Sequence, residues 1–326
     1  MDRAESQIRG IINRRPDLGP KFLRLIFHDC IGGCDGCVDL DNRDNFGLLT
    51  PIQALRPVVA DEGEFLSRAD IWALASFVAI DRAQGRQQIA WNMNTVGRVD
   101  CENTGRRCVD RAGRTVTCRD TKGSHHDHPA AEVTTRELFT FFRDEFGYTT
   151  RQTVAVMGAH TIGQLSTENS GIDGPNGWMI NSQTLDNEYY AELVGGTSPD
   201  SPRSELVQGA PGWGRNIERN DGNSFPNKHI WTGFPGGTKI VMLNADIALV
   251  RQLDGSNVQN NGRVNCRFVG ENTCPVAEQS FRFAVEYTFD NMLWLRDFRQ
   301  VMIIMIENGY RRAGCAGNGP CRLIAN

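Results

Sequence analysis

The chain has 326 residues, of which 40% are hydrophobic and 23% are charged, a composition typical of a soluble protein with a large core. Its formal net charge is −4, which gives no electrostatic reason to expect nucleic acid or an anionic membrane as a partner. The longest apolar run, residues 301–306, is far shorter than the roughly 18 residues of a membrane span. We therefore expect a monomer that binds neither nucleic acid nor membrane.

Helical patterns dominate the chain, whereas strand-like alternation is scarce. Ser67 is a typical N-cap, Thr134 and Glu137 form a capping box, and residues 150–153 are expected to cap the next helix. Apolar spacing predicts helices over residues 8–14, 21–28, 71–80, 138–146, 154–160, 246–252 and 281–308. The sequence therefore predicts an all-α fold. Two long irregular stretches, 92–129 and 195–237, are expected to be functional or disulfide-stapled loops.

Ten cysteines occur in clusters among loop-forming residues, which favours disulfides and an oxidising compartment. We expect two local pairs, Cys266–Cys274 and Cys315–Cys321. Three cysteines then remain in each of two clusters, so at least one bridge must join the clusters if all ten are paired. The N-terminal segment lacks the apolar centre of a secretory signal, so the expectation of a secreted protein rests on the cysteines.

The first chemical motif is Arg24-Leu-Ile-Phe-His28-Asp-Cys. Residues four apart on a helix share one face, so Arg24 and His28 are expected to project into the same space. A permanent cation beside a titratable imidazole suits peroxide chemistry, because the base moves a proton while the cation holds the charge that develops on oxygen. The alternative is a surface arginine and a core histidine.

The second motif is Gly158-Ala-His160-Thr-Ile-Gly163 at the end of an apolar helix. The small residues before His160 are expected to let a flat cofactor approach the backbone, and the imidazole can bind iron. The alternative is a helix C-cap with a buried histidine.

In this order, the two motifs resemble the plant-type haem peroxidase superfamily of plants, fungi and bacteria. Further segments resemble those of the family in the same order: residues 45–48, 67–75, 97–100, 185–190 and 242–249. The resemblance implies a single domain over residues 1–326 with about ten helices. It also implies a distal lobe at about 1–145, a proximal lobe at about 146–326, and haem b between the two lobes.

The resemblance also implies roles for individual residues. His160 would be the fifth ligand of the haem iron, and Asp246 would accept a hydrogen bond from its other ring nitrogen. Asn45 would hold Nδ1–H of His28, so that Arg24, His28 and Asn45 form the catalytic set. Phe27 would pack over the haem.

The segment 169–178 resembles the Ser-Gly-x-Glu-Gly-Pro-Trp segment of ascorbate and cytochrome c peroxidases. On this match Trp178 would stack beside His160 and donate a hydrogen bond to Asp246; the alternative is an ordinary core tryptophan. Phe27 is typical of secreted members, so the chain combines secreted-type distal features with intracellular-type proximal ones.

Two loops resemble the family's cation sites. Asp29, Gly33 and Asp35 match distal calcium ligands, but Cys37 stands where a hydroxyl ligand is usual, and sulfur is a poor ligand for calcium. The alternative role for these carboxylates is loop capping. A proximal calcium or potassium ion is implied by a second set, in which Met179 replaces one usual ligand: Thr161, Asn181, Thr184 and Asp186.

Two other metal sites are less favoured. The histidine-rich segment 124–128 is expected to be a solvated loop rather than a zinc or copper site. Asp17 and Lys21 stand where a fungal-type manganese site would have two glutamates.

The implied activity is the reduction of hydrogen peroxide through a ferryl intermediate, with one-electron oxidation of small donors, chiefly phenolic or aromatic ones. Ascorbate and cytochrome c stay open as donors. One rival is a haem-binding sensor or structural protein of the same fold with weak or no peroxidase activity. The other is a haem-free, disulfide-rich structural protein.

Overall fold

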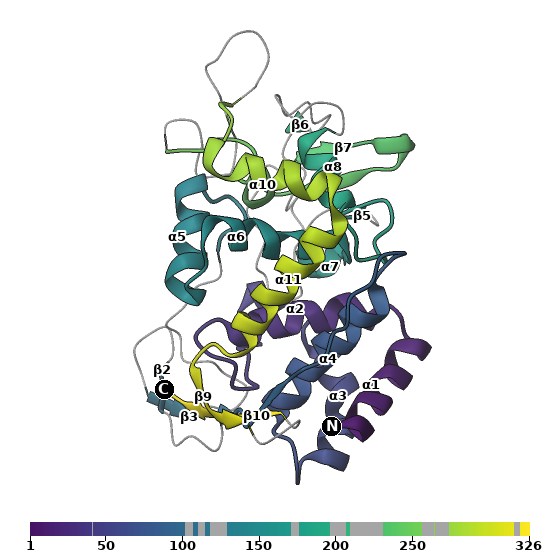
Figure 1. Cartoon of the computed structure of the whole chain (residues 1–326), viewed down its shortest axis with the longest axis vertical. Helices are drawn as coiled ribbons and strands as arrows, with labels where there is room; N and C mark the ends of the chain where they lie inside the picture. Colours follow the sequence, from purple (N-terminus) through teal and green to yellow (C-terminus); the bar gives the residue numbers. More distant parts are fainter. Residues whose placement is uncertain are drawn as a thin grey trace. The chain divides into compact units, whose positions relative to one another are not determined.

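The structure is a computed structural model that describes residues 1–40, 42–101, 107–109, 115–117, 129–170, 176–195, 207–208, 231–255, 264, 274–315 and 320–326. Most elements in these ranges are helices, as expected, and they belong to two compact units (Figure 1). Within the same ranges, no helix is both long enough and apolar enough to cross a membrane. Unit 1 comprises Met1–Gln84, Gln88–His128 and Met302–Asn326, and unit 2 comprises Gly85–Gln87 and Pro129–Val301.

The core of unit 1 is a helix that packs against three others. This helix, α4 (Arg68–Ala83), is buried from Ala69 to Ile80, and the Ser67 hydroxyl accepts a hydrogen bond from the Asp70 amide, which confirms the expected N-cap. The three neighbours of α4 are α1 (Asp2–Arg14), α2 (Leu18–Cys30) and α3 (Leu49–Glu62). Together they make a helical scaffold in which α2 carries both Arg24 and His28.

A buried arginine fastens the turn at residues 97–100 to this scaffold. The Arg98 guanidinium forms an ion pair with Asp70 at 2.7 Å and donates to the Ile306 carbonyl at the end of α11 (Asn291–Ile306). Asp100 accepts hydrogen bonds from two backbone amides in the first turn of α4. The family-like turn therefore fastens the N-terminal turn of α4 to the neighbouring chain, and removing one partner of so buried an ion pair is strongly destabilising.

Short strands complete unit 1. A three-stranded sheet has the order β1 (Thr95–Val96), β10 (Cys321–Ala325) and β9 (Tyr310–Cys315), with β1 parallel and β9 antiparallel to β10. The disulfide Cys315–Cys321 joins β9 to β10, as expected from the local spacing. A separate antiparallel pair consists of β2 (Arg107–Val109) and β3 (Thr115–Thr117), and a single 3-10 turn, η1 (Arg43–Asn45), precedes α3.

Unit 2 combines helices with a five-stranded sheet. Its helices are α5 (Thr135–Phe146), α6 (Thr150–Met157), η3 (Gly158–Thr161), α7 (Thr167–Ser170), α8 (Glu188–Val194), α9 (Asn244–Ile247), α10 (Glu278–Phe289) and the part of α11 up to Val301. The sheet has the order β4 (Gln164–Leu165), β5 (Asn176–Gly177), β8 (Ile240–Met242), β7 (Trp231–Gly233) and β6 (Val207–Gln208). Along the chain, the turn η4 (Pro235–Gly237) connects β7 to β8. α10 packs against α6 and α8.

Three helix boundaries in unit 2 differ from the sequence expectation. The capping box of α5 at Thr134 is confirmed, but α6 is capped by Thr149 with Gln152, one residue earlier than expected. The single helix expected over 281–308 is two helices, because the Asp290 backbone leaves the helical region and its carboxylate accepts from the Leu293 amide to start α11. The helix expected over 246–252 is the short α9.

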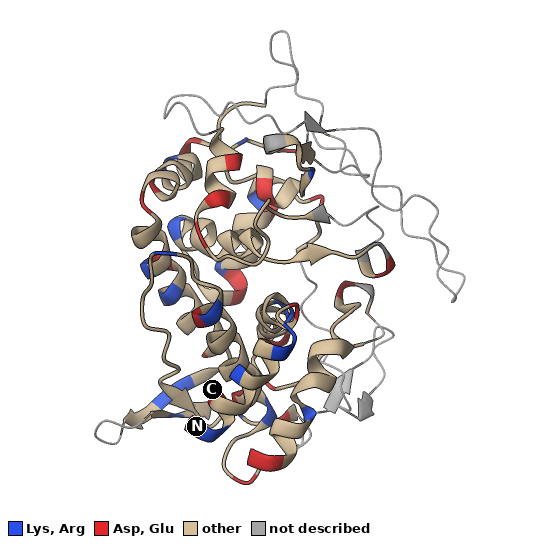
Figure 2. Cartoon of the chain, turned by 90° about the vertical axis from the view of Figure 1, so that its right-hand side faces the viewer, with Lys and Arg blue, Asp and Glu red and all other residues tan. Residues whose placement is uncertain are grey.

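Acidic and basic side chains are interspersed over the described elements of both units (Figure 2). This distribution fits the small net charge of −4.

Candidate active site

In unit 1, α2 presents His28 next to the amide of Asn45. Nδ1 of His28 lies 2.7 Å from Oδ1 of Asn45, and the Asn45 amide nitrogen donates to the Asp39 carbonyl at 2.7 Å. Because the amide nitrogen is engaged by a carbonyl, the oxygen must face His28 and accept from it. This fixes the proton of His28 on Nδ1 and leaves the lone pair on Nε2, the tautomer that a general base requires.

The Arg24 guanidinium is braced by the same short segment. Its two terminal nitrogens donate to the carbonyls of Phe46 and Asp44, at 2.8 and 2.6 Å, which flank Asn45. The side chain keeps solvent-accessible surface, yet protein surrounds much of it, and this desolvation lowers the pKa of Arg24 to about 10 while Asp44 opposes the shift. The guanidinium therefore keeps its charge at neutral pH. The structure thus brings Arg24, His28 and Asn45 together as the sequence predicts.

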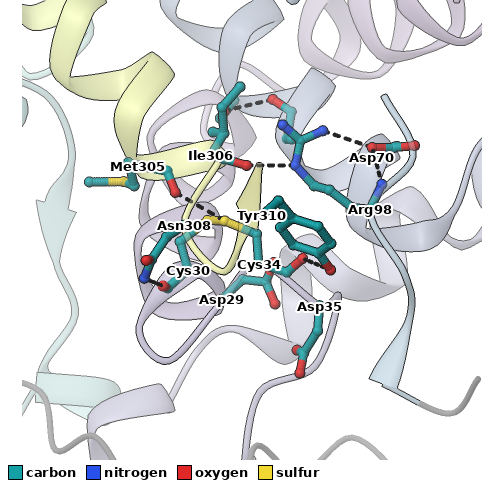
Figure 3. The surroundings of a disulfide bond; sticks show 12 residues. Asp29, Cys30, Cys34, Asp35, Asp70, Arg98, Met305, Ile306, Asn308 and Tyr310 are labelled. Atoms are coloured by element: carbon teal, nitrogen blue, oxygen red, sulfur yellow. Dashed lines mark hydrogen bonds and ion pairs between the residues drawn. A yellow bond between two sulfur atoms is a disulfide. The ribbon is translucent and has the colours of Figure 1, made fainter. Parts of the chain in front are cut away.

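The loop after α2 is closed by disulfides. Cys30 pairs with Cys34, and Cys37 pairs with Cys101, which is the bridge expected between the two cysteine clusters. Around the first bridge, Asn308 donates to the Cys30 carbonyl and Tyr310 donates to the Cys34 carbonyl (Figure 3). The end of the helix that carries His28 is therefore tied to the C-terminal segment of unit 1.

The carboxylates of this loop bind backbone. Asp29 and Asp35 each accept a hydrogen bond from the Cys37 amide, at 3.0 and 3.2 Å. These contacts are those of loop capping, and the Cys37 sulfur is engaged by its disulfide. Among the described residues, no group of three histidine, cysteine, aspartate or glutamate side chains is arranged to hold a metal ion.

In unit 2, His160 lies in η3, directly after α6, and not within the helix as expected. Its Nδ1 is 2.7 Å from Oδ1 of Asp246, a residue of α9 that is 0% exposed. The other carboxylate oxygen of Asp246 accepts from the Leu243 amide at 2.7 Å. With Nδ1 bound, Nε2 of His160 is the ring nitrogen that can bind a metal, and the side chain keeps 31% of its surface exposed.

Trp178 stacks on the His160 imidazole. The ring centroids are 4.1 Å apart and the planes differ by 3°, which is the arrangement expected from the sequence. The expected hydrogen bond from the indole to Asp246 is absent from the contacts of these described residues. The carboxylate is instead occupied by another donor, Tyr189, whose hydroxyl lies 2.8 Å from Oδ1.

Tyr189 is the residue of this site to which the sequence analysis gave no role. It is fully buried, and its ring meets His160 edge-on. Burial, together with the nearby Asp246 carboxylate, raises the pKa of the phenol well above its usual range, so the hydroxyl stays a donor. The only sequence signal was its place in the Asp-Asn-x-Tyr-Tyr segment.

Aromatic packing also requires a glycine at position 158. A Cβ atom there would lie 2.5 Å from the hydroxyl of Tyr190 and 2.6 Å from Nε1 of Trp294. The sequence analysis did not predict this packing requirement.

The proximal cation residues come from two segments, with Thr161 at the end of η3 and Asn181, Thr184 and Asp186 in the segment before α8. The Thr161 hydroxyl is 3.4 Å from Oδ1 of Asp186, and the Thr184 amide donates to the Asn181 carbonyl. Glu188 adds a second carboxyl, and its pKa is raised by desolvation and, to a smaller extent, by the Asp186 charge.

Some of the residues considered in the sequence analysis lie outside the described residues. These are the histidine-rich segment 124–128, the cysteines at 118 and 266 and the side chain of Cys108, whereas Cys274 is disulfide-bonded.

The chain is similar in sequence to known peroxidases. A family model described as Peroxidase matches residues 4–261. The chain is 31% identical over 200 residues to a protein of Yarrowia lipolytica provisionally named heme-binding peroxidase, an alignment that covers 57% of this chain and 60% of that relative. A protein of the same name from Candida albicans is 28% identical over 247 residues, covering 72% of this chain and 69% of the relative. An L-ascorbate peroxidase 1, cytosolic, of Oryza sativa subsp. indica is 28% identical over 208 residues, covering 60% of this chain and 73% of the relative.

Proposed function

Because the chain belongs to the peroxidase family of plant, fungal and bacterial haem proteins, we propose that it is a haem enzyme that reduces hydrogen peroxide and oxidises small donors one electron at a time. Phenolic or aromatic donors are the proposed substrates. Because of the family resemblance, we assign His28 with its neighbours and His160 with its neighbours to the same haem.

The residues of unit 2 fit a haem ligand set. His160 is fixed at Nδ1 by a buried carboxylate and has Nε2 and part of its surface available. A metal-binding histidine usually donates its second ring N–H to such a partner, which orients the ring and raises its basicity. His160 would therefore hold the iron, with Trp178 against its face and Phe27 among the residues that contact the macrocycle. When bound, the haem supplies the redox chemistry, accepting two oxidising equivalents from peroxide and releasing them singly.

The residues of unit 1 supply the proton transfer. With the proton held on Nδ1, Nε2 of His28 carries the lone pair, so it would take a proton from one oxygen of hydrogen peroxide and return it to the other oxygen, which leaves as water. The Arg24 cation stabilises the negative charge that grows on the departing oxygen. Asn45 keeps the His28 proton on Nδ1, and its neighbours hold the guanidinium.

The observation that carries the proposal is the 2.7 Å contact between Nδ1 of His28 and the oriented Asn45 amide, because it favours the tautomer that a general base requires. The test is to reconstitute the purified protein with haem b and mix it with one equivalent of peroxide. A rapid shift of the Soret band, followed by its return when a phenol is added, is expected. A stable haem complex without that shift would mean a haem-binding sensor, and no haem uptake would mean a structural protein.

The proposal includes a secreted location, with which the disulfides described above are compatible.

The proposal also includes one structural cation, calcium or potassium, in unit 2. The support for it is a set of oxygen donors from Thr161, Asn181, Thr184 and Asp186. A rise in melting temperature on adding either ion to chelator-treated protein, lost in Asp186→Asn, is the expected result.

A further inference from the structure

One oxygen atom of Asp246 serves two donors. Oδ1 accepts from Nδ1 of His160 at 2.7 Å and from the Tyr189 hydroxyl at 2.8 Å. The other oxygen is engaged by the Leu243 amide. Asp246 and Tyr189 are both fully buried, so their hydrogen bond is shielded from solvent.

Two donors on one carboxylate oxygen compete for its electron density. Hydrogen bonds to an ionised group are strong, and they are stronger still in a low-dielectric interior. The phenol therefore weakens the pull of Asp246 on the imidazole proton. That pull decides how anionic the imidazole is, and thus how strongly it donates to a metal.

We infer that Tyr189 is a positioning residue that limits the anionic character of His160 by holding Oδ1 of Asp246. The inference rests on the proposed function, since it concerns His160 as a ligand of haem iron. It assigns to Tyr189 the place beside Asp246 that the sequence pattern had given to Trp178.

The sign of the effect separates this role from simple packing. In Tyr189→Phe the ring remains but the donor is lost, so Asp246 pulls harder on Nδ1–H and the imidazole donates more strongly to iron. The ferrous iron–histidine stretching frequency should rise, and the ferric/ferrous reduction potential should fall. If Tyr189 supported Asp246 only by ring packing, Tyr189→Phe would change neither readout. If its hydroxyl only held the carboxylate in place, loosening the carboxylate would weaken the pull and move both readouts the other way.

The experiment uses the haem-loaded protein, with resonance Raman spectroscopy for the stretch and spectroelectrochemistry for the potential. The matched control is Tyr190→Phe, since Tyr190 is the next residue and is equally buried, but its hydroxyl donates to the Val154 carbonyl at 2.7 Å and to no carboxylate. Tyr190→Phe is expected to leave both readouts at their wild-type values. In an Asp246→Asn background, Tyr189→Phe should change neither.

Replacement of Tyr189 by 3-fluorotyrosine provides a variant that keeps the side chain in place and donates more strongly. It should lower the stretching frequency and raise the potential, even if Tyr189→Phe does not fold. Unchanged or reversed shifts in a protein that binds haem and reacts with peroxide would overturn this inference alone. Failure of the wild-type protein to bind haem would overturn the proposed function together with it.

Discussion

The two histidines of the candidate site are held in the same way by partners of different charge. His28 in unit 1 and His160 in unit 2 each have Nδ1 at 2.7 Å from a side-chain oxygen. The partner of His28 is the neutral amide of Asn45, whereas the partner of His160 is the carboxylate of Asp246. A neutral acceptor orients an imidazole and leaves it free to gain and lose a proton, while an anionic acceptor makes it a stronger metal ligand. In the proposed function, the charge of the acceptor, rather than the geometry of the contact, therefore distinguishes the base from the metal ligand.

The largest expected effect comes from removing the base. His28→Ala should slow the reaction with peroxide by roughly 10²–10⁴-fold, the range of general acid–base catalysis, while haem stays bound because His160 is untouched. Stopped-flow absorbance at the Soret band measures the rate, and the haem content of the purified variant is the control. A rate within a few fold of wild type would remove His28 from the mechanism.

Neutralising the anionic partner should have the next largest effect. Asp246→Asn keeps the shape but removes the charge, so haem affinity should fall by about 10–100-fold, the usual cost of losing a ligand's hydrogen-bond partner. Haem transfer to apomyoglobin gives the dissociation rate. Asp246→Glu, which keeps the charge, is the control, and equal affinities in Asp246→Asn and wild type would contradict the assignment.

Replacing the neutral acceptor of His28 by an anionic one should give its imidazole the kind of partner that His160 has. In Asn45→Asp an anionic acceptor favours protonated His28, raising its pKa by about 1–3 units relative to the wild type. A raised pKa means that the free base appears only at higher pH, so the acid side of the pH–rate profile should move upward by that amount. Asn45→Gln is the matched neutral control, and an unmoved profile in Asn45→Asp would show that Asn45 does not act through His28.

The smallest effect is expected at Trp178. Trp178→Phe keeps a ring against His160 and removes an indole N–H that makes no bond to Asp246 among the described contacts. Haem affinity should stay within about 3-fold of wild type, which corresponds to less than about 0.7 kcal/mol. A loss as large as that of Asp246→Asn, measured by the same transfer assay, would show that the indole supports the carboxylate after all.

The features that the sequence predicted well are those with a local or a family-wide pattern. The i, i+4 spacing of Arg24 and His28, the cap at Ser67 and the pairing of His160 with Asp246 all appear in the structure. A bridge between the cysteine clusters followed from counting alone, although its members, Cys37 and Cys101, did not.

Two of the features that the sequence left out depend on contacts between distant segments, and the third is a local capping contact. Tyr189 reaches Asp246 across 57 positions of the chain, and nothing in the local pattern of either residue indicates this partner. Gly158 is small because Tyr190 and Trp294 approach it from elsewhere. The break at Asp290 is a capping contact inside an otherwise continuous apolar pattern, so periodicity did not reveal it.

The segment Asp44-Asn45-Phe46 has a consequence for how the protein tolerates change. The hydrogen bonds of Arg24 go to the backbone carbonyls of positions 44 and 46, and the Asp44 charge acts on it as well, whereas His28 uses the side chain of position 45. A mutational scan should thus find the outer two positions more permissive than the middle one. Deletion of any one of the three would shift the register and remove the hydrogen bonds to both Arg24 and His28 at once, so a change in the length of this segment is expected to cost more than a substitution at position 44 or 46.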